Sequence, residues 1–140
     1  MITSEQALLR YGPPKNESGM TLFDVPKELE IGAIPKRIYC NRDLVGPLKS
    51  AFANLIGRGY VNELRTWDGC FNIRPIRGAA PLSLHSWGLA IDVNANWNRL
   101  GQKATLSEGF VKCFTDAGFD WGGEFSRIDG MHFQLAEFPN

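Results

Sequence analysis

The amino-acid sequence predicts an α+β fold, in which helices pack on a small, largely antiparallel sheet. Segments with helical spacing of apolar residues are interspersed with short runs that alternate polar and apolar residues. The chain has 140 residues, of which 44% are hydrophobic and 21% are charged. This is the size and composition of one ordinary folded domain, so we expect a single domain spanning residues 1–140.

Residues 1–40 are expected to wrap irregularly over the core. A short helix is predicted for residues 4–10, because Thr3 and Gln6 have the spacing of a capping box and a Gly-Pro-Pro run follows. Residues 13–38 carry much Pro and Gly and little periodicity. We expect an irregular segment there, with room for one short strand.

A longer helix is predicted from Arg42 to about Ile56. Asn41 is a good N-cap, because its side-chain oxygen can accept a hydrogen bond from a first-turn amide, and Gly57 can end the helix. Apolar residues recur at helical spacing and give the helix one buried face. They are Leu44, Leu48, Phe52 and Leu55.

A β-hairpin is predicted next. Two strand-like runs, Tyr60–Trp67 and Cys70–Arg74, flank the pair Asp68-Gly69. Asp-Gly between such runs is a strong signal for a two-residue turn, because both central residues need positive φ. The resulting register pairs Thr66 with Phe71, Leu64 with Ile73, and Glu63 with Arg74.

The second half of the chain supplies the rest of the sheet. Residues 75–88 are rich in Pro, Gly and Ser and are expected to form a loop. A strand is expected at Ala90–Asn94, followed by a helix at Ser107–Ala117 that Gly118 ends. Two further strands are expected at Trp121–Phe125 and His132–Leu135.

Charge and hydropathy argue against several kinds of partner. Fifteen Lys plus Arg balance fifteen Asp plus Glu, whereas proteins that bind nucleic acid usually carry a basic excess. No run approaches 18 apolar residues, so no membrane span is expected. The N-terminus lacks a signal-peptide pattern, and we expect a monomer made in the cytoplasm. Cys40, Cys70 and Cys113 form no CxxC pair and are expected to be small buried residues.

Three side chains suited to binding a metal lie on or beside predicted strands. Alternation along Ala90–Asn94 puts Asp92 on the face away from the large apolar residues. Gly88 permits a bend that can bring His85 beside Asp92, and His132 lies on the polar face of the last strand. Two imidazoles and a carboxylate are a donor set that zinc accepts, with a fourth position left for water. An ordinary His–Asp polar pair remains the alternative.

Asp129 lies three residues before His132, with Gly130 between them. If the chain turns there, the carboxylate can take a proton from a metal-bound water and pass it to a leaving amine. Strict strand geometry would put the two residues on opposite faces, so this role requires the turn. Asp129-Gly130 is also an ordinary turn sequence, and that alternative stays open.

The order of these residues resembles one enzyme family. Ser-x-His-x-x-Gly-x-Ala-x-Asp at 83–92 and Asp-x-x-His at 129–132 are similar to the motifs of the zinc D-Ala-D-Ala carboxypeptidases and L-Ala-D-Glu peptidases of peptidoglycan, which include VanY-like enzymes and many phage endolysins. Cys70–Gly78 and Trp121–Phe125 look like the small phage endolysin branch. The resemblance covers about residues 60–136, which we expect to be the motif-bearing core.

The resemblance implies a zinc peptidase fold, shared with the signalling domain of hedgehog proteins. It implies one Zn2+ per chain, held by His85, Asp92 and His132, with Asp129 as the general base and acid. Many relatives carry Glu where this chain has Asp129. The family also uses an upstream Arg to stabilise the oxyanion of the transition state.

The sequence leaves the choice of that arginine open. Arg74 is preferred because alternation points it away from Ile73, although a cross-strand pair with Glu63 would also satisfy it. Arg77 is the candidate for holding a substrate carboxylate. Ser83 either donates a hydrogen bond to the substrate or caps the loop.

The expected function is zinc-dependent hydrolysis of an amide bond in the peptide stem of bacterial peptidoglycan, by an endolysin that reaches the cell wall after release, for example through a holin-type pore. The motifs do not separate L-Ala-D-Glu endopeptidase from D-Ala-D-Ala carboxypeptidase activity. The alternatives are a cytoplasmic D-Ala-D-Ala dipeptidase and a zinc-containing binding module without turnover. A cysteine hydrolase using Cys70 and His85 has little support, because Cys70 adjoins the predicted hairpin turn.

Overall fold

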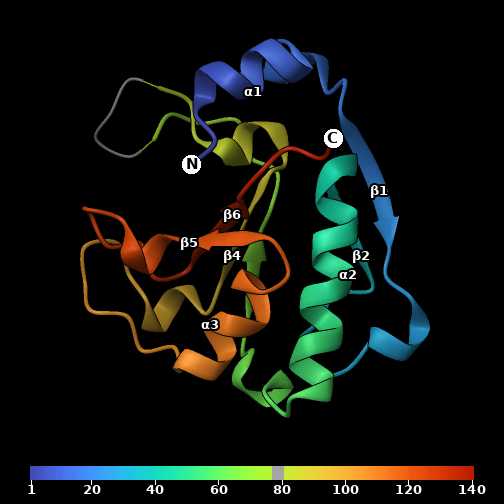
Figure 1. The fold of residues 1–140 in the computed structure, drawn as a ribbon, viewed down its shortest axis with the longest axis vertical. Coiled ribbons are helices and arrows are strands. Elements are labelled where there is room, and N and C mark those ends of the chain that lie inside the picture. Colours follow the sequence, from blue (N-terminus) through green and yellow to red (C-terminus); the bar gives the residue numbers. More distant parts are fainter. Residues whose placement is uncertain (77–80) are drawn as a thin grey trace.

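The computed structural model describes residues 1–76 and 81–140. Its longer helices are α1 (Ser4–Tyr11), α2 (Arg42–Gly57) and α3 (Glu108–Thr115). The strands are β1 (Met20–Asp24), β2 (Arg37–Asn41), β3 (Trp67–Gly69), β4 (Ala90–Val93), β5 (Phe119–Trp121) and β6 (His132–Leu135). Strands β1 and β2 form one antiparallel sheet, and a second antiparallel sheet has the order β3-β4-β6-β5 (Figure 1). The architecture is therefore α+β, as the sequence predicted.

Local signals set the starts of the helices. At α1, Thr3 Oγ1 accepts a hydrogen bond from the Gln6 amide at 3.1 Å, and Gln6 Oε1 accepts one from the Thr3 amide at 2.9 Å, which completes the capping box. Helix α2 begins after Asn41, whose side chain accepts a hydrogen bond from the Asp43 amide at 2.9 Å. The predicted apolar stripe of α2 is fully buried: Leu44, Leu48, Phe52 and Leu55.

The four-stranded sheet buries one face under two helices. Phe114 of α3 packs on Phe133 of β6, with ring centroids 4.5 Å apart, and Phe110 lies 6.5 Å from the same ring. Helix α2 contacts α3 and reaches the sheet through Phe52, which meets Trp67 of β3 edge-on. Successive side chains of a strand point to opposite faces of the sheet. Because the helices cover the face that carries Phe133, the residues next to Phe133 in β6 lie on the opposite face.

The predicted hairpin is wrong. Asp68 and Gly69 lie within β3, which pairs with β4 across a register shift, and the φ of Gly69 is +133°. The positive φ that suggested a turn is therefore used at a β-bulge. Residues 61–63 form a 3-10 helix, Leu64 is buried, and Ile73 is 46% exposed, so these two residues do not share a core face.

Two other segments differ from the expectation. Residues 13–38 contain β1 and the start of β2, so two paired strands replace the single short strand expected. The strand expected at Trp121–Phe125 ends at Trp121 and is followed by a 3-10 turn, Gly122–Glu124. A Cβ on Gly122 would lie 2.3 Å from the Asp129 carbonyl oxygen, so the chain turns where two backbone segments approach closely.

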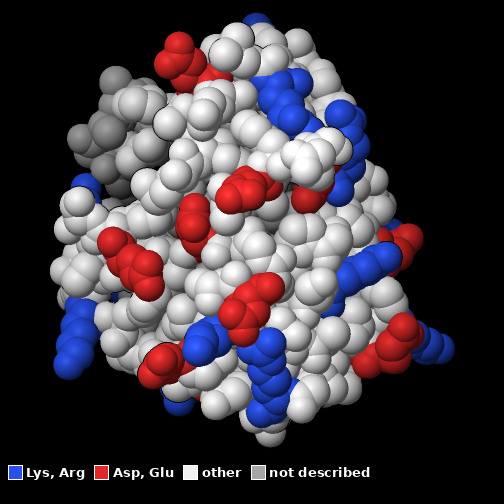
Figure 2. All heavy atoms as spheres, viewed as in Figure 1, with Lys and Arg blue, Asp and Glu red and all other residues white. Residues whose placement is uncertain are grey.

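The surface carries charges of both signs. Figure 2 shows Lys and Arg interspersed with Asp and Glu on the visible face, in keeping with the formal net charge of zero. Among the helices of the described residues, none combines the length and hydropathy needed to cross a bilayer. Cys40, Cys70 and Cys113 are free thiols in buried positions, as expected from their spacing.

Candidate metal centre

His85 lies in a short 3-10 helix, Leu84–Trp87, and its amide is capped by the Ser83 side chain. Gly88 ends this helix with φ +66°, and a Cβ there would lie 2.7 Å from the Asn41 amide nitrogen, so the tight bend requires glycine. The His85 ring is 97% buried, and its Nδ1 donates to the Cys70 carbonyl oxygen at 2.7 Å. The opposite nitrogen, Nε2, is thereby left with its lone pair directed at Asp92.

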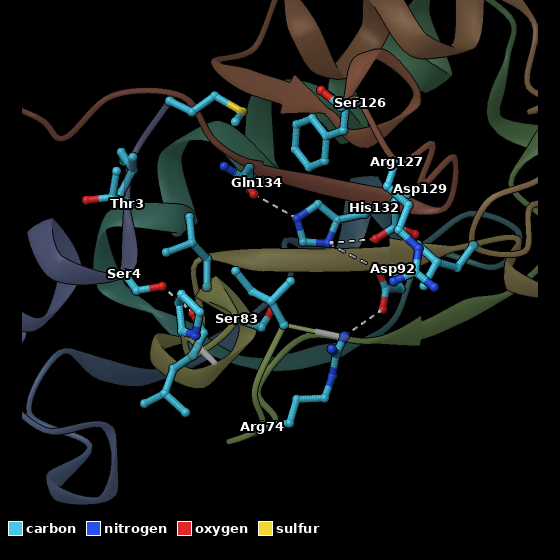
Figure 3. Close-up of a pocket in the computed structure, with 18 of the residues that line it drawn as sticks. Thr3, Ser4, Arg74, Ser83, Asp92, Ser126, Arg127, Asp129, His132 and Gln134 are labelled. Carbon is cyan, nitrogen blue, oxygen red and sulfur yellow. Dashed lines mark hydrogen bonds and ion pairs between the residues drawn. The ribbon is translucent and has the colours of Figure 1, made fainter. Parts of the chain in front are cut away.

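Asp92 and His132 lie on neighbouring strands in direct register. The pairing of β4 with β6 sets Asp92 opposite His132 and Ala90 opposite Gln134, so the polar side chains share one face and the small Ala90 leaves room for Gln134. His132 Nε2 donates to Gln134 Oε1 at 2.8 Å. This bond turns His132 Nδ1 toward the Asp92 carboxylate (Figure 3).

Potential ligand atoms of three residues converge at this place, and both oxygens of Asp92 take part. His85 Nε2 lies 3.2 Å from Asp92 Oδ2 and 3.2 Å from His132 Nδ1, and His132 Nδ1 lies 3.6 Å from Asp92 Oδ1. Ligands at 2.0–2.2 Å from a tetrahedral zinc ion stand about 3.3–3.6 Å apart, so the spacing fits such an ion.

The electrostatics of the cluster also call for a cation. Both facing ring nitrogens present lone pairs when the rings are neutral, and Asp92 Oδ1 is buried without a hydrogen-bond partner. An orphaned carboxylate oxygen beside two lone pairs is costly unless a positive charge lies between them. The group His85, Asp92 and His132 could therefore hold a metal ion.

Burial and neighbouring charges shift the pKa values at the cluster. Burial alone would raise the pKa of Asp92, but when the metal-free rings of His132 and His85 are protonated, their hydrogen bonds and positive charges outweigh burial and lower that pKa well below its usual range. Burial would lower the pKa of His132, but the bond to Asp92 raises it above the ordinary value. Asp92 is therefore ionised at neutral pH and suited to binding a cation.

Asp129 lies next to the cluster because the chain turns as the motif required. The His132 amide donates to the Asp129 carbonyl at 3.0 Å, and Asp129 Oδ2 lies 3.9 Å from His132 Nδ1. The Trp121 indole donates to the Gly130 carbonyl at 2.8 Å, and the Asp129 amide donates to the Gly122 carbonyl at 2.9 Å. These two bonds hold the turn. Burial is the main cause that raises the pKa of the Asp129 carboxyl.

Arg74 approaches the Asp92 carboxylate. Its Nη2 lies 4.0 Å from Asp92 Oδ2, and its backbone exchanges hydrogen bonds with the Ser86 hydroxyl at 3.1 and 3.2 Å. The cross-strand pair with Glu63 is wrong, because both oxygens of the Glu63 carboxylate accept hydrogen bonds from Ser107 at 2.7 Å. The structure thus brings Arg74 to the cluster.

The other predicted substrate-binding residues are placed less directly. Ser83 is buried, and its hydroxyl accepts a hydrogen bond from the His85 amide at 3.3 Å, which is the capping contact. Arg77 lies outside the described residues. A thiol nucleophile at Cys70 is contradicted, because its carbonyl rather than its thiol faces His85, and burial raises the pKa of the thiol.

A cleft of about 830 Å³ opens over the cluster. Asp92, Asp129 and His132 lie in it, together with Arg74, Ser83 and the N-terminal residues Met1–Glu5 (Figure 3). Sequence reasoning missed the contribution of this N-terminal segment, since no local pattern there indicates a site. It also missed the role of Gln134, although its position two residues after His132 on a strand was an available signal.

Comparison with known proteins bears on the chemistry of the cleft. A family model described as D-alanyl-D-alanine carboxypeptidase matches residues 77–135, fewer than half of the 140 residues. The matched part contains the convergent cluster, namely His85, Asp92 and His132, and also Asp129. Searches of the curated proteins and of the solved structures found no match. The family match supports a peptidase.

Proposed function

We propose that this chain is a zinc-dependent peptidase that hydrolyses an amide bond in the peptide stem of bacterial peptidoglycan. The observation that carries the proposal is the triangle of His85 Nε2, an Asp92 oxygen and His132 Nδ1, with Asp129 beside it. The match to the D-alanyl-D-alanine carboxypeptidase model supports the substrate class.

His85, Asp92 and His132 would hold one zinc ion. When bound there, zinc supplies a Lewis acid and a coordinated water whose pKa is lowered to about 7. The chain's own residues prepare this site before the metal arrives. The Cys70 carbonyl and Gln134 fix the two ring orientations, which is how partners behind the ligands raise metal affinity.

Asp129 would be the general base and then the general acid. Its carboxylate lies 3.9 Å from the metal-facing nitrogen of His132, close enough to take a proton from the attacking water and deliver it to the leaving amine nitrogen. Burial raises its pKa, which makes the carboxylate a better proton acceptor than an exposed aspartate. Its presence also favours turnover over the alternative of a zinc-containing binding module.

Arg74 would bind the oxygen of the scissile carbonyl. Its guanidinium lines the cleft and lies 4.0 Å from Asp92, so a substrate carbonyl lying over the cluster can accept a hydrogen bond from it. Charge develops on that oxygen in the transition state, and a fixed cation stabilises it more than it stabilises the ground state.

The test is digestion of purified peptidoglycan by the zinc-loaded protein, with a chelated control, and analysis of the products by mass spectrometry. Loss of terminal alanine would indicate a D-Ala-D-Ala carboxypeptidase, and cleavage after the first alanine an L-Ala-D-Glu endopeptidase. Asp129→Asn should retain one equivalent of zinc and lose about 10²–10⁴-fold in kcat. Unchanged turnover in this variant would remove Asp129 from the reaction.

The outcome also separates the remaining alternatives. A protein that leaves peptidoglycan intact but releases alanine from free D-Ala-D-Ala would be a dipeptidase. Bound zinc without cleavage of either substrate would favour the binding module. The role as a phage-type endolysin, access to the wall through a holin-type pore and the monomeric state stay predictions.

A further inference from the structure

The cleft has two ends of different chemistry. Charged side chains gather around the metal-binding cluster, with Arg74 and Asp129 on either side of Asp92. Figure 3 shows Thr3 and Ser4 across the His132 ring from Asp129 and Arg127. The cleft residues at the end near Ser4 are mainly apolar: Met1, Ile2, Ile76, Pro81 and Leu82.

The N-terminal wall, which carries Met1 and Ile2, is fixed relative to the cluster. The Ser4 hydroxyl donates to the Leu82 carbonyl, and the Trp87 indole donates to the Gly12 carbonyl at 2.8 Å. These bonds tie the two ends of α1 to residues on either side of His85. The N-terminal segment is therefore a fixed part of the cleft.

The adjoining wall at this end is a short paired segment. The Ile76 amide donates to the Pro81 carbonyl at 2.7 Å, and the Ser83 amide donates to the Arg74 carbonyl at 2.9 Å. Arg74 and Ile76 are two residues apart on this extended segment, so they project to the same side. Along the cleft, Arg74, which approaches Asp92, is thus followed by the apolar side chain of Ile76.

We propose that Met1–Glu5, together with Ile76, Pro81 and Leu82, forms a subsite for an apolar group of the substrate adjacent to the scissile bond. The inference rests on the proposed function, because the occupant is the substrate of the same metal site in one continuous cleft. An apolar group is favoured there because its binding removes apolar surface of both partners from water.

The chain offers a matched pair of variants for the test. Ile76 lines the cleft and is 44% exposed, and Ile73 is 46% exposed but is not among the lining residues. Because both side chains are largely in solvent, Ile76→Glu and Ile73→Glu should fold equally well. With a soluble muramyl pentapeptide as substrate, Ile76→Glu should raise KM about tenfold more than it lowers kcat. Ile73→Glu should keep both constants within about twofold. Equal KM values in the two variants would overturn the subsite.

A second measurement does not depend on turnover. Isoleucine methyl groups of the zinc-loaded protein can be followed by NMR during titration with the same muramyl pentapeptide. The methyl signals of Ile2 and Ile76 should shift, and that of Ile73 should not. Shifts at Ile2 and Ile76 without cleavage would keep the subsite and refute the peptidase. Normal cleavage with no shift at these two residues would refute the subsite alone, and neither binding nor cleavage would refute both.

Discussion

Replacing Trp121 by Phe should separate the placing of Asp129 from the binding of metal. The Trp121 indole donates to the Gly130 carbonyl at 2.8 Å, and Gly130 is the buried residue directly after Asp129. Phenylalanine keeps an aromatic ring against Phe133, on which Trp121 stacks at 6.4 Å between centroids, but removes the donor. The His132 ring keeps its contacts with Asp92 and Gln134.

The magnitude follows from the bond that is lost. A hydrogen bond of this kind contributes about 1 kcal/mol, and the carbonyl left without a partner adds a similar cost, so we expect about 1–2 kcal/mol of lost stability. For a chain of this length, that corresponds to a decrease in Tm of about 3–8 °C. A turn relaxed by about 1 Å displaces the Asp129 carboxylate and should lower kcat by about 10–100-fold, with one equivalent of zinc still bound.

Asn54→Ala is the control for stability alone. Asn54 Nδ2 donates to the Cys113 carbonyl at 2.9 Å and joins α2 to α3 beneath the sheet, so its loss should lower Tm by a similar amount and leave kcat unchanged. The assay combines thermal melts, zinc content by atomic spectroscopy, and kcat and KM on the fragment released from peptidoglycan. If Trp121→Phe keeps kcat within about twofold of the wild type, the turn does not depend on this bond and the reasoning fails.

Three further predictions concern the metal centre. Gln134→Leu should weaken zinc binding about 10–100-fold in a chelator competition, because His132 loses the acceptor that orients it. Gln134→Glu should restore zinc binding. A zinc affinity of Gln134→Leu equal to that of the wild type would argue against this positioning role. Zinc at 100 times its Kd should stabilise the protein by about 2.7 kcal/mol, and His85→Ala should abolish this gain; a stabilisation that persists in His85→Ala would place the metal elsewhere. In the metal-free protein, Asp92 raises the pKa of His132, so the stability that this ring contributes is complete below its unfolded pKa of about 6.5 and is lost as pH rises through the raised value. Metal-free wild type should therefore lose more stability than His132→Gln as pH rises above about 6.5, and parallel pH profiles of Tm would contradict the direction of this shift.

Strong local patterns gave the correct elements where a segment and its immediate neighbours determine the structure. The capping box at Thr3 and the N-cap at Asn41 start their helices as expected, because a cap is made by residues within one turn. Alternation along β4 and β6 put Asp92 and His132 on their polar faces, because the period of a strand is a local property. The required turn at Asp129 was also predicted from the Gly that follows it.

The errors lie where distant backbone groups decide. Asp68-Gly69 has a local preference for a turn, but the segment instead pairs with β4 as a bulged edge strand. The residues of β4 with which it pairs lie more than 20 positions away in the sequence. Trp121–Phe125 alternates too weakly to remain a strand once Gly122 must pass against the Asp129 backbone. In both segments, pairing with a distant part of the chain outweighed local preference.

The sequence by itself therefore predicted the candidate donor set and the two strands that carry Asp92 and His132, because residue type and alternation can be read directly from the order of residues. Only the tertiary structure decided which nitrogen of each histidine faces the Asp92 carboxylate, through the Cys70 carbonyl and Gln134. It also decided that Met1–Glu5 forms a wall of the cleft. Such contacts join groups as many as 78 residues apart, and no local pattern specifies a partner at that distance.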